Sequence, residues 1–166
     1  MREHRFAVES GLELYGREHG ATDGPTIVAL HGLTRNSEDF DSFAAYLPDG
    51  WRMLALDFRG RGQSDYDPNW QQYVPAMYVR DVREVLQQAE IDRAVVLGTS
   101  LGGLVTMLLA SVTPELAAGA ILNDIGCEID PRGLARIQQY TGKLPPVASW
   151  GDARDQVKLV YGETLP

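Results

Sequence analysis

The chain has 166 residues, of which 44% are hydrophobic and 23% charged, a composition typical of one soluble domain with its own core. A formal net charge of −8 argues against a nucleic-acid-binding role, because neutralising phosphates requires clustered Lys and Arg. The longest apolar runs, such as Ile27–Leu30 and Leu104–Ala110, are far shorter than the ~20 residues of a membrane-spanning helix.

The first predicted elements are an antiparallel hairpin and a buried strand. The hairpin arms, Arg5–Glu9 and Leu12–Arg17, alternate polar and apolar residues around a Ser10–Gly11 turn. The following run "PTIVALHG", residues 25–32, is continuously apolar until its last two residues. Such a run is typical of a central strand that is buried on both faces.

Helices and strands then alternate along the chain. The predicted elements are a helix capped by Asn36 or Ser37 and running to about Leu47, strand 51–58, a helix from Val74 to about Glu90, strand 93–99, helix 101–112 and strand 118–126. Parallel strands need crossover connections of this kind. The order therefore predicts an α/β fold, with a mostly parallel sheet, helices on both of its faces and an antiparallel hairpin at its entrance.

After Gly126 the character of the sequence changes. Two weakly amphipathic stretches, Arg132–Tyr140 and Asp152–Tyr161, are separated by a segment that contains Gly142 and the pair Pro145–Pro146, and no strand is predicted there. We therefore expect residues 1–126 to form the core, with six strands, and residues 127–166 to begin a helical cap.

The turn between strand 93–99 and helix 101–112 carries the clearest chemical signal. Gly98-Thr99-Ser100-Leu101-Gly102 matches G-x-S-x-G, the nucleophile elbow, in the strand–turn–helix context that this motif requires. Glycine neighbours leave room for a strained backbone, and the helix N-terminus favours a developing negative charge. Ser100 is therefore the predicted nucleophile.

A second turn, "LHGL" at residues 30–33, follows another predicted strand. Its glycine allows the backbone to turn, so that the N–H of Leu33 and the N–H of Leu101 are the candidate donors of an oxyanion hole. His31 is expected to stabilise this loop through hydrogen bonds, in preference to acting as a base.

With these motifs in place, the chain resembles the α/β-hydrolase fold family from Arg5 to Gly126. The segments "HGLTRNSEDF", "LDFRGRGQSD", "VVLGTSLGG" and "ILNDIG" are similar to that family's signature segments in order and spacing. Serine at the elbow separates the chain from members that use aspartate there, such as haloalkane dehalogenases and epoxide hydrolases. In the "DFRGRGQS" segment, Asp57, Arg59, Gly60, Gly62 and Ser64 are expected to shape a turn through structural hydrogen bonds.

The catalytic triad that the resemblance implies is incomplete in this sequence. In the family the order is serine, then acid, then histidine. Asp124, at the end of strand 118–126, is a candidate acid, but it could equally hydrogen-bond its own turn, and other members place the acid one strand later. No histidine follows His31, so the sequence is expected to be the N-terminal portion of a longer polypeptide or one part of a cleaved one.

The leading functional hypothesis is a serine hydrolase that acts on ester or related acyl substrates through an acyl-enzyme, without a cofactor. Alternatives are a carbon–carbon bond hydrolase or a haloperoxidase-like perhydrolase that uses the same serine, and a hydrolase-fold module that binds a ligand without turnover. The expected partners are a small acyl substrate and the remainder of the hydrolase core; the 166 residues alone are expected to be inactive, because they lack the base.

Location and metal binding complete the expectations. The N-terminus carries charges at once and has no apolar signal segment, which favours a cytoplasmic protein. The single cysteine, Cys127, fits a reducing compartment and is expected to be a buried thiol. The spacing of His4, His19, His31 and Cys127 does not resemble a set of metal ligands.

Overall fold

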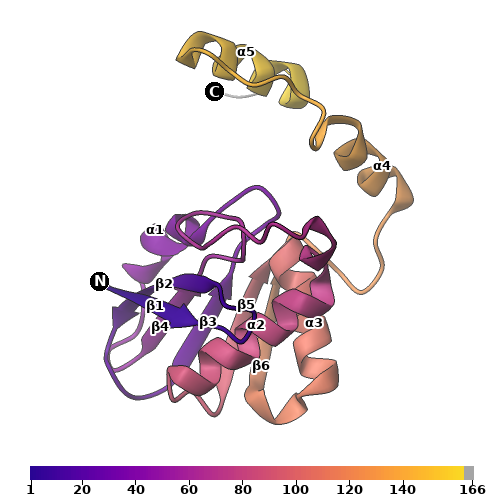
Figure 1. Cartoon of the computed structure of the whole chain (residues 1–166). Helices are drawn as coiled ribbons and strands as arrows, with labels where there is room; N and C mark the ends of the chain where they lie inside the picture. The colour runs from indigo at the N-terminus through magenta and orange to yellow at the C-terminus, as the bar shows by residue number, and fades with distance from the viewer. Residues whose placement is uncertain (163–166) are drawn as a thin grey trace. The chain divides into compact units, whose positions relative to one another are not determined.

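The computed structural model describes residues 1–162 of the chain (Figure 1). The chain is divided into two compact units; the first comprises Met1–Gly126, and the second begins at Cys127. The last four positions of the predicted cap, 163–166, lie outside the described residues.

The first unit contains one sheet of six strands. The strands are β1 Arg2–Ala7, β2 Glu13–Gly20, β3 Thr26–Leu30, β4 Arg52–Leu56, β5 Ala94–Thr99 and β6 Ala117–Asn123. Their spatial order is β1-β2-β4-β3-β5-β6, with β1, β2 and β4 paired antiparallel and β4, β3, β5 and β6 paired parallel. The predicted fold class, a mostly parallel sheet entered through a hairpin, is confirmed.

The helices connect these strands in the predicted order. The α-helices are α1 Asp41–Ala44, α2 Pro75–Gln88, α3 Leu101–Val112, α4 Pro131–Tyr140 and α5 Trp150–Tyr161. Short 3-10 helices occupy η1 Ser37–Phe40, η2 Trp70–Gln72 and η3 Pro114–Leu116. Pro75 stands in the first turn of α2, where its missing N–H leaves no intrahelical hydrogen bond unmade.

The prediction of a single helix over residues 36–47 is wrong in one respect. Asn36 does cap the segment, since its side chain accepts a hydrogen bond from the Glu38 N–H at 3.0 Å. Beyond it, however, η1 passes directly into the four-residue α1, and the N–H groups of Tyr46 and Leu47 donate to carbonyls three residues back. The segment therefore forms a 3-10 helix followed by a single short α-helical turn, and not one regular α-helix.

Two apolar layers pack on opposite faces of the sheet. Alternate residues of the strands face opposite sides, so that Val28 and Leu30 of β3 join the layer under α2 and α3, whereas Ile27 and Ala29 join the layer under η1. Figure 1 shows α2 and α3 side by side across the sheet. All five residues of β3 are buried, as predicted for a central strand.

Strand β6 forms an open edge of the sheet. It pairs with β5 on one side, and no strand of the described residues pairs with its other side. No residue of β6 is buried, and Ile121 is 46% exposed. An apolar strand edge of this kind carries unpaired backbone donors and acceptors that another strand can use.

The second unit is built from α4 and α5. Asp130 and Ser149 cap their N-termini through side-chain oxygens, and the Arg136 guanidinium donates to the Val160 carbonyl at 3.3 Å. No residue of α4 is buried. Cys127, at the start of this unit, is exposed, so the expectation of a buried thiol is wrong.

A buried ion pair ties the loop after β4 to α2. Arg59 is fully buried, and its Nε and Nη2 donate to the two carboxylate oxygens of Asp81 at 2.6 and 2.5 Å. Its Nη1 donates to Asp67 at 2.9 Å. These hydrogen bonds hold the pKa of Arg59 above its ordinary value, so the side chain stays charged in the interior.

Removal of the Asp81 charge should therefore destabilise the protein strongly. In an Asp81→Asn variant the buried guanidinium loses its bidentate partner, and we expect the free energy of unfolding to fall by about 3 kcal/mol. Urea unfolding followed by circular dichroism measures this change. Glu84→Gln, which removes the partly buried partner of the exposed Arg80 on the same helix, is the control and should move the midpoint much less. Equal losses in the two variants would contradict the assignment.

Candidate active site

The predicted nucleophile lies on a strained turn. Ser100 has φ 49° and ψ −110°, a conformation that L-residues rarely adopt, and it connects β5 directly to the first turn of α3. A side chain at Gly98 would collide with the backbone of Gly102, and one at Gly102 would collide with the Leu30 carbonyl. The glycines of the motif are thus required by the close approach of α3 to the strand ends.

The elbow adjoins the turn that follows β3. A Cβ placed on Gly32 would lie 3.8 Å from the Ser100 Cβ, so the two turns lie close together at this point. The Ser100 N–H donates to the Asn123 carbonyl at 2.9 Å, which leaves the Leu101 N–H at the start of α3. Leu33 follows Gly32 in its turn. The structure therefore brings the segments of both predicted oxyanion donors to the same end of the sheet.

His31 has a structural role, as expected. Its Nε2 accepts a hydrogen bond from the Phe58 N–H at 3.1 Å, which requires that the proton be on Nδ1, and Nδ1 lies 2.7 Å from the Gly32 carbonyl. Burial lowers the pKa of His31 below its ordinary value of 6.5, so the ring is neutral at pH 7. Both ring nitrogens are occupied by backbone groups, and neither faces Ser100 as a base.

The "DFRGRGQS" segment also builds structure, as predicted. The buried Asp57 carboxylate accepts hydrogen bonds from the Ser37 N–H at 2.6 Å and the Gln63 N–H at 2.8 Å. Ser64 Oγ donates to the Asp57 carbonyl at 2.6 Å. Gly62 has φ 53° and packs directly on the Asp57 carboxylate, where a side chain would not fit. Asp57 thereby joins its own loop to the start of η1.

Asp124 stands beside the elbow on the neighbouring strand. Thr99 and Asn123 are register partners in β5 and β6, so that Ser100 and Asp124 each follow one member of the pair. Asp124 is exposed and has φ 56°. Within residues 1–162 its carboxylate has no hydrogen-bond partner. The turn-capping hydrogen bond that was the alternative role for Asp124 is thus not found among the described residues.

One residue at this end of the sheet was missed by sequence reasoning. Arg61 Nε donates to the Leu33 carbonyl at 3.1 Å, and Nη1 donates to the Tyr78 hydroxyl at 2.8 Å. Arg61 occupies a variable position between the two glycines of its motif, so the motif gives no sign of it. Only the fold shows that the loop after β4 passes beside the turn after β3.

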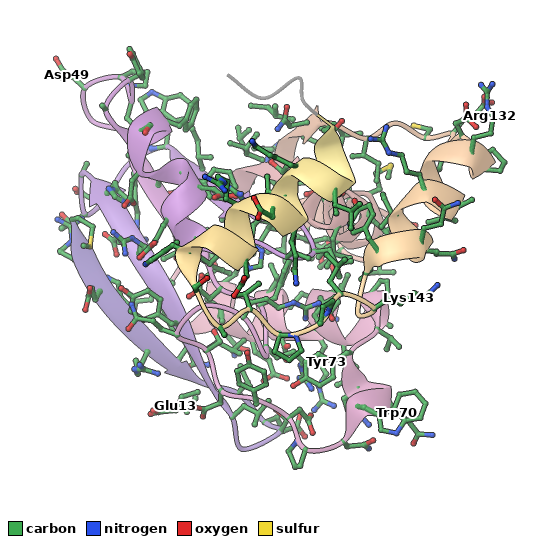
Figure 2. The ribbon with its side chains drawn as sticks, turned by 90° about the horizontal axis from the view of Figure 1, so that it is seen from above. Glu13, Asp49, Trp70, Tyr73, Arg132 and Lys143 are labelled. Atoms are coloured by element: carbon green, nitrogen blue, oxygen red, sulfur yellow. The ribbon has the colours of Figure 1, made fainter. Side chains whose placement is uncertain are left out.

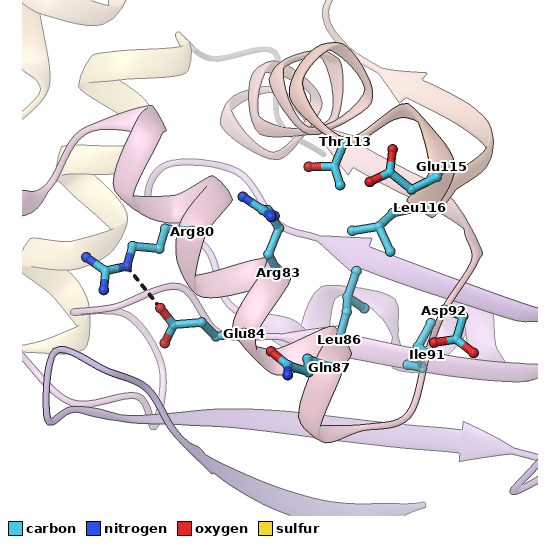
Figure 3. A pocket seen from close by; sticks show the side chains of 10 residues that line it. All are labelled: Arg80, Arg83, Glu84, Leu86, Gln87, Ile91, Asp92, Thr113, Glu115 and Leu116. Carbon is cyan, nitrogen blue, oxygen red and sulfur yellow. Dashed lines mark hydrogen bonds and ion pairs between the residues drawn. The ribbon is translucent and has the colours of Figure 1, made fainter.

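Two surface grooves differ in their relation to the elbow. A groove of about 760 Å³ is lined by residues of η1, α1, β5 and β6, and includes Thr99 and Asn123 beside Ser100. A second groove, of about 470 Å³, lies between α2 and η3 and contains the Arg80–Glu84 ion pair (Figure 3). No residue of either predicted oxyanion turn lines the second groove, whereas Thr99 of the elbow lines the first, so the first is the nearer of these two grooves to Ser100.

Two negative findings concern residues 1–162. No group of three or more His, Cys, Asp or Glu side chains there is arranged to hold a metal ion. Over the same residues, none of the helices combines the length and apolar character needed to cross a bilayer.

Comparison with known proteins points to one family. The family model described as the alpha/beta hydrolase fold matches residues 25–165 of this chain. A serine hydrolase-like protein of Danio rerio is 35% identical over 122 residues, covering 74% of this chain and 37% of that protein. A 3-hydroxybutyrate-oligomer hydrolase of Cupriavidus necator is 34% identical over 116 residues, covering 70% of this chain and 40% of that protein.

A solved structure extends the match to nearly the whole chain. The crystal structure of an alpha/beta hydrolase from Novosphingobium aromaticivorans superposes with a TM-score of 0.87 at 40% identity. The superposition covers 95% of this chain but 56% of that one. The chain thus spans about two fifths of the two curated relatives above and little more than half of this solved structure.

The neutral state of His31 should make stability depend on pH. Well above pH 6.5 His31 is neutral in both the folded and the unfolded chain, so its contribution is fully present. As the pH falls below 6.5 the unfolded chain takes up a proton before the folded chain does. Stability should then fall by up to about 1.4 kcal/mol per pH unit until the lowered pKa of the folded state is reached.

Urea unfolding at about pH 7.5 and about pH 5.5 measures this dependence. In His31→Gln, whose amide can accept from Phe58 and donate to Gly32, the pH dependence should be smaller than in the wild type. Burial also lowers the pKa of His19, so this histidine contributes to the pH dependence as well. His19→Gln measures its contribution separately from that of His31. An unchanged pH dependence in His31→Gln would contradict the prediction.

Proposed function

The chain belongs to the alpha/beta hydrolase fold family, and we propose that it carries the nucleophilic half of a serine hydrolase acting on esters or related acyl compounds. The observation that carries this proposal is the strained backbone of Ser100, at φ 49° between β5 and α3. A positive φ at a serine costs conformational free energy, of the order of 1–3 kcal/mol. Such strain is expected where a turn must present a side chain for chemistry.

In the proposed reaction the Ser100 hydroxyl attacks the substrate carbonyl carbon. The oxyanion that forms is stabilised by the N–H groups of Leu33 and Leu101 and by the N-terminal end of the α3 dipole. Collapse of this intermediate breaks the bond to the leaving alcohol, which takes the proton that the base removed from the serine. Water, activated by the same base, then hydrolyses the acyl-enzyme and frees Ser100.

The proposed base lies outside residues 1–166. His31 is the last histidine of the sequence, and its ring nitrogens hold the backbone. We propose that a histidine beyond residue 166, in the same polypeptide or in a companion chain, serves as the base. Asp124 is the proposed acid that orients it, since its carboxylate is exposed beside the elbow; an acid that follows a later strand is the alternative.

The relatives support acyl chemistry. One is named a serine hydrolase-like protein and another hydrolyses oligomers of 3-hydroxybutyrate, according to its name. We extend to this chain only the class of reaction, hydrolysis of an ester or similar acyl bond. The single cysteine fits a reducing compartment, and a cytoplasmic location stays part of the proposal.

We also propose that the rest of a hydrolase core covers the open edge of the sheet. The apolar edge of β6 and the groove beside it lie on the same side of the first unit, because Ile121 and Leu122 line that groove. A parallel strand on β6 would satisfy its free backbone groups. The length of the relatives beyond the matched region is consistent with such a partner.

Covalent labelling of Ser100 tests the reaction class. In the assembly that includes the base, a fluorophosphonate probe should label Ser100 and abolish ester hydrolysis, because the activated hydroxyl attacks the phosphorus. Ser100→Ala should lose labelling and at least about 10³-fold of kcat. Ser111→Ala, at the exposed end of the same helix, is the control and should keep both. The proposal fails if Ser100 stays unlabelled while a known esterase reacts.

A substrate panel on the same assembly separates the competing reactions. Hydrolysis of p-nitrophenyl esters supports the proposal, whereas cleavage of vinylogous diketones or peracid formation would assign the serine to a carbon–carbon hydrolase or a perhydrolase. Tight ligand binding without turnover would favour a binding module.

The native mass tests the proposed companion. Intact-mass measurement of the purified native protein should give more than the 18.3 kDa of these residues, either as a longer polypeptide or as a stable complex. Size-exclusion chromatography with light scattering gives the same quantity in solution. A monodisperse monomer at 18.3 kDa would overturn the proposal that a further core segment pairs with β6.

A further inference from the structure

The loop after β4 sends one side chain to the turn that carries a proposed oxyanion donor. Arg61 lies in that loop, and its Nε donates to the Leu33 carbonyl at 3.1 Å. We propose that Arg61 is a positioning residue that holds the Leu33 N–H in the orientation required by the oxyanion. This inference rests on the proposed hydrolase function, and it adds a residue that acts through Leu33 without touching the substrate.

The guanidinium of Arg61 is itself held firmly. Its Nη1 donates to the Arg59 carbonyl at 3.0 Å and to the Tyr78 hydroxyl at 2.8 Å. Its central carbon lies 5.3 Å from the ring centre of Tyr78 and 5.7 Å from that of Tyr73, within the range of cation–π attraction. Because several contacts fix the guanidinium, the position of Nε is determined before any substrate binds.

The two aromatic rings have fixed positions as well. Tyr78 is buried on α2, with 2% of its surface exposed. The hydroxyl of Tyr73, labelled in Figure 2, accepts from the Asp67 N–H at 2.8 Å and lies 3.1 Å from the Asp67 carbonyl. Gly60 packs against the Tyr73 ring so closely that a side chain there would collide with it. The support of Arg61 therefore extends to the body of the domain.

Arg61 completes a set of restraints around one peptide unit. The Leu33 N–H shares a planar trans peptide with the Gly32 carbonyl, so the two groups point in opposite directions. The Gly32 carbonyl accepts from the Arg35 N–H at 3.2 Å and from His31 Nδ1 at 2.7 Å. Arg61 binds the next carbonyl, that of Leu33. With both carbonyls held, rotation about the backbone bonds of Leu33 is restricted on each side of its Cα.

The geometry explains why arginine is suited to this position. A guanidinium donates in several directions within one plane and stacks on aromatic rings, whereas a lysine ammonium is a single compact charge. A lysine at position 61 could hold the Leu33 carbonyl or the Tyr78 hydroxyl, but it would lose the guanidinium's contact with the two rings. We expect Arg61→Lys to retain part of the positioning effect.

A matched control is available in the same region. Arg5 donates to the carbonyl of Gln63, two residues from Arg61, at 3.0 Å, and its central carbon lies 5.7 Å from the ring centre of Tyr15. It therefore makes the same kinds of contact with the same loop. It makes no hydrogen bond to residues 32–35 within the described part of the chain.

The test compares Arg61→Ala, Arg61→Lys and Arg5→Ala in the assembly that carries the base. We measure kcat and KM for a p-nitrophenyl ester, the rate of fluorophosphonate labelling and the thermal midpoint. Arg61→Ala should lower kcat and the labelling rate about 10- to 100-fold, with KM changed by less than about twofold, since the effect is on the transition state. Arg61→Lys should be intermediate, and Arg5→Ala should resemble the wild type.

Added methylguanidinium provides a further readout, because it can occupy the space between the two rings. At millimolar concentration it should restore part of kcat in Arg61→Ala and leave Arg5→Ala unchanged, a result that loss of folding would not produce. If Arg61→Ala does not fold, the kcat of Arg61→Lys decides: a loss at unchanged KM supports the inference.

Failure of this inference is distinguishable from failure of the proposed function. A wild type that hydrolyses the ester and is labelled at Ser100, together with Arg61 variants whose kcat equals that of Arg5→Ala, would overturn the positioning role alone. A wild type that is inactive and unlabelled would overturn the hydrolase function and this inference with it.

Discussion

The close packing of α3 against the strand ends is the constraint on which the rest of the site depends. Gly98 and Gly102 leave no space for side chains between the helix and the backbone of β3 and β5, so the helix can begin immediately after the strand. Ser100 must then adopt a positive φ to connect the two elements. The same packing brings the elbow close to Gly32. One steric requirement thus sets both the strain at the proposed nucleophile and its distance from the proposed oxyanion turn.

The turn at Gly32 is rigid because separate parts of the fold hold it. The His31 ring connects it to the start of the loop after β4, and Arg61 connects it to α2 through Tyr78. Asp57 links that same loop to η1, while the buried Arg59–Asp81 pair fixes the loop to α2. A preorganised hydrogen-bond donor needs restraints of this kind, since a flexible one would lose part of its effect in reorganising. The polar residues of "HGL" and "DFRGRGQS" thus serve the geometry of the backbone more than direct chemistry.

The open side of the sheet contrasts with this rigidity. The layer under α2 and α3 holds the larger cluster of buried side chains, whereas on the opposite face a groove lined by residues of η1 and α1 reaches β6. The proposed base and the proposed companion segment would both approach the carboxyl ends of β5 and β6, so one segment could supply both. Asp124, exposed at this end with an unpaired carboxylate within residues 1–162, is placed where a histidine from such a segment could meet it.

The sequence by itself determined the order of the elements, because hydrophobic periodicity and glycine turns are local properties of the chain. It predicted all six strands, the helices α2 to α5 within a few residues, and the elbow at Ser100. Tertiary structure decided whatever depends on which distant segments meet. It divided the helix predicted at 36–47, exposed Cys127, and directed the Arg61 side chain to Leu33, a residue 28 positions earlier in the chain. The physical reason is that the partner of a hydrogen bond between loops depends on strand register and loop path, which no periodicity in the sequence records.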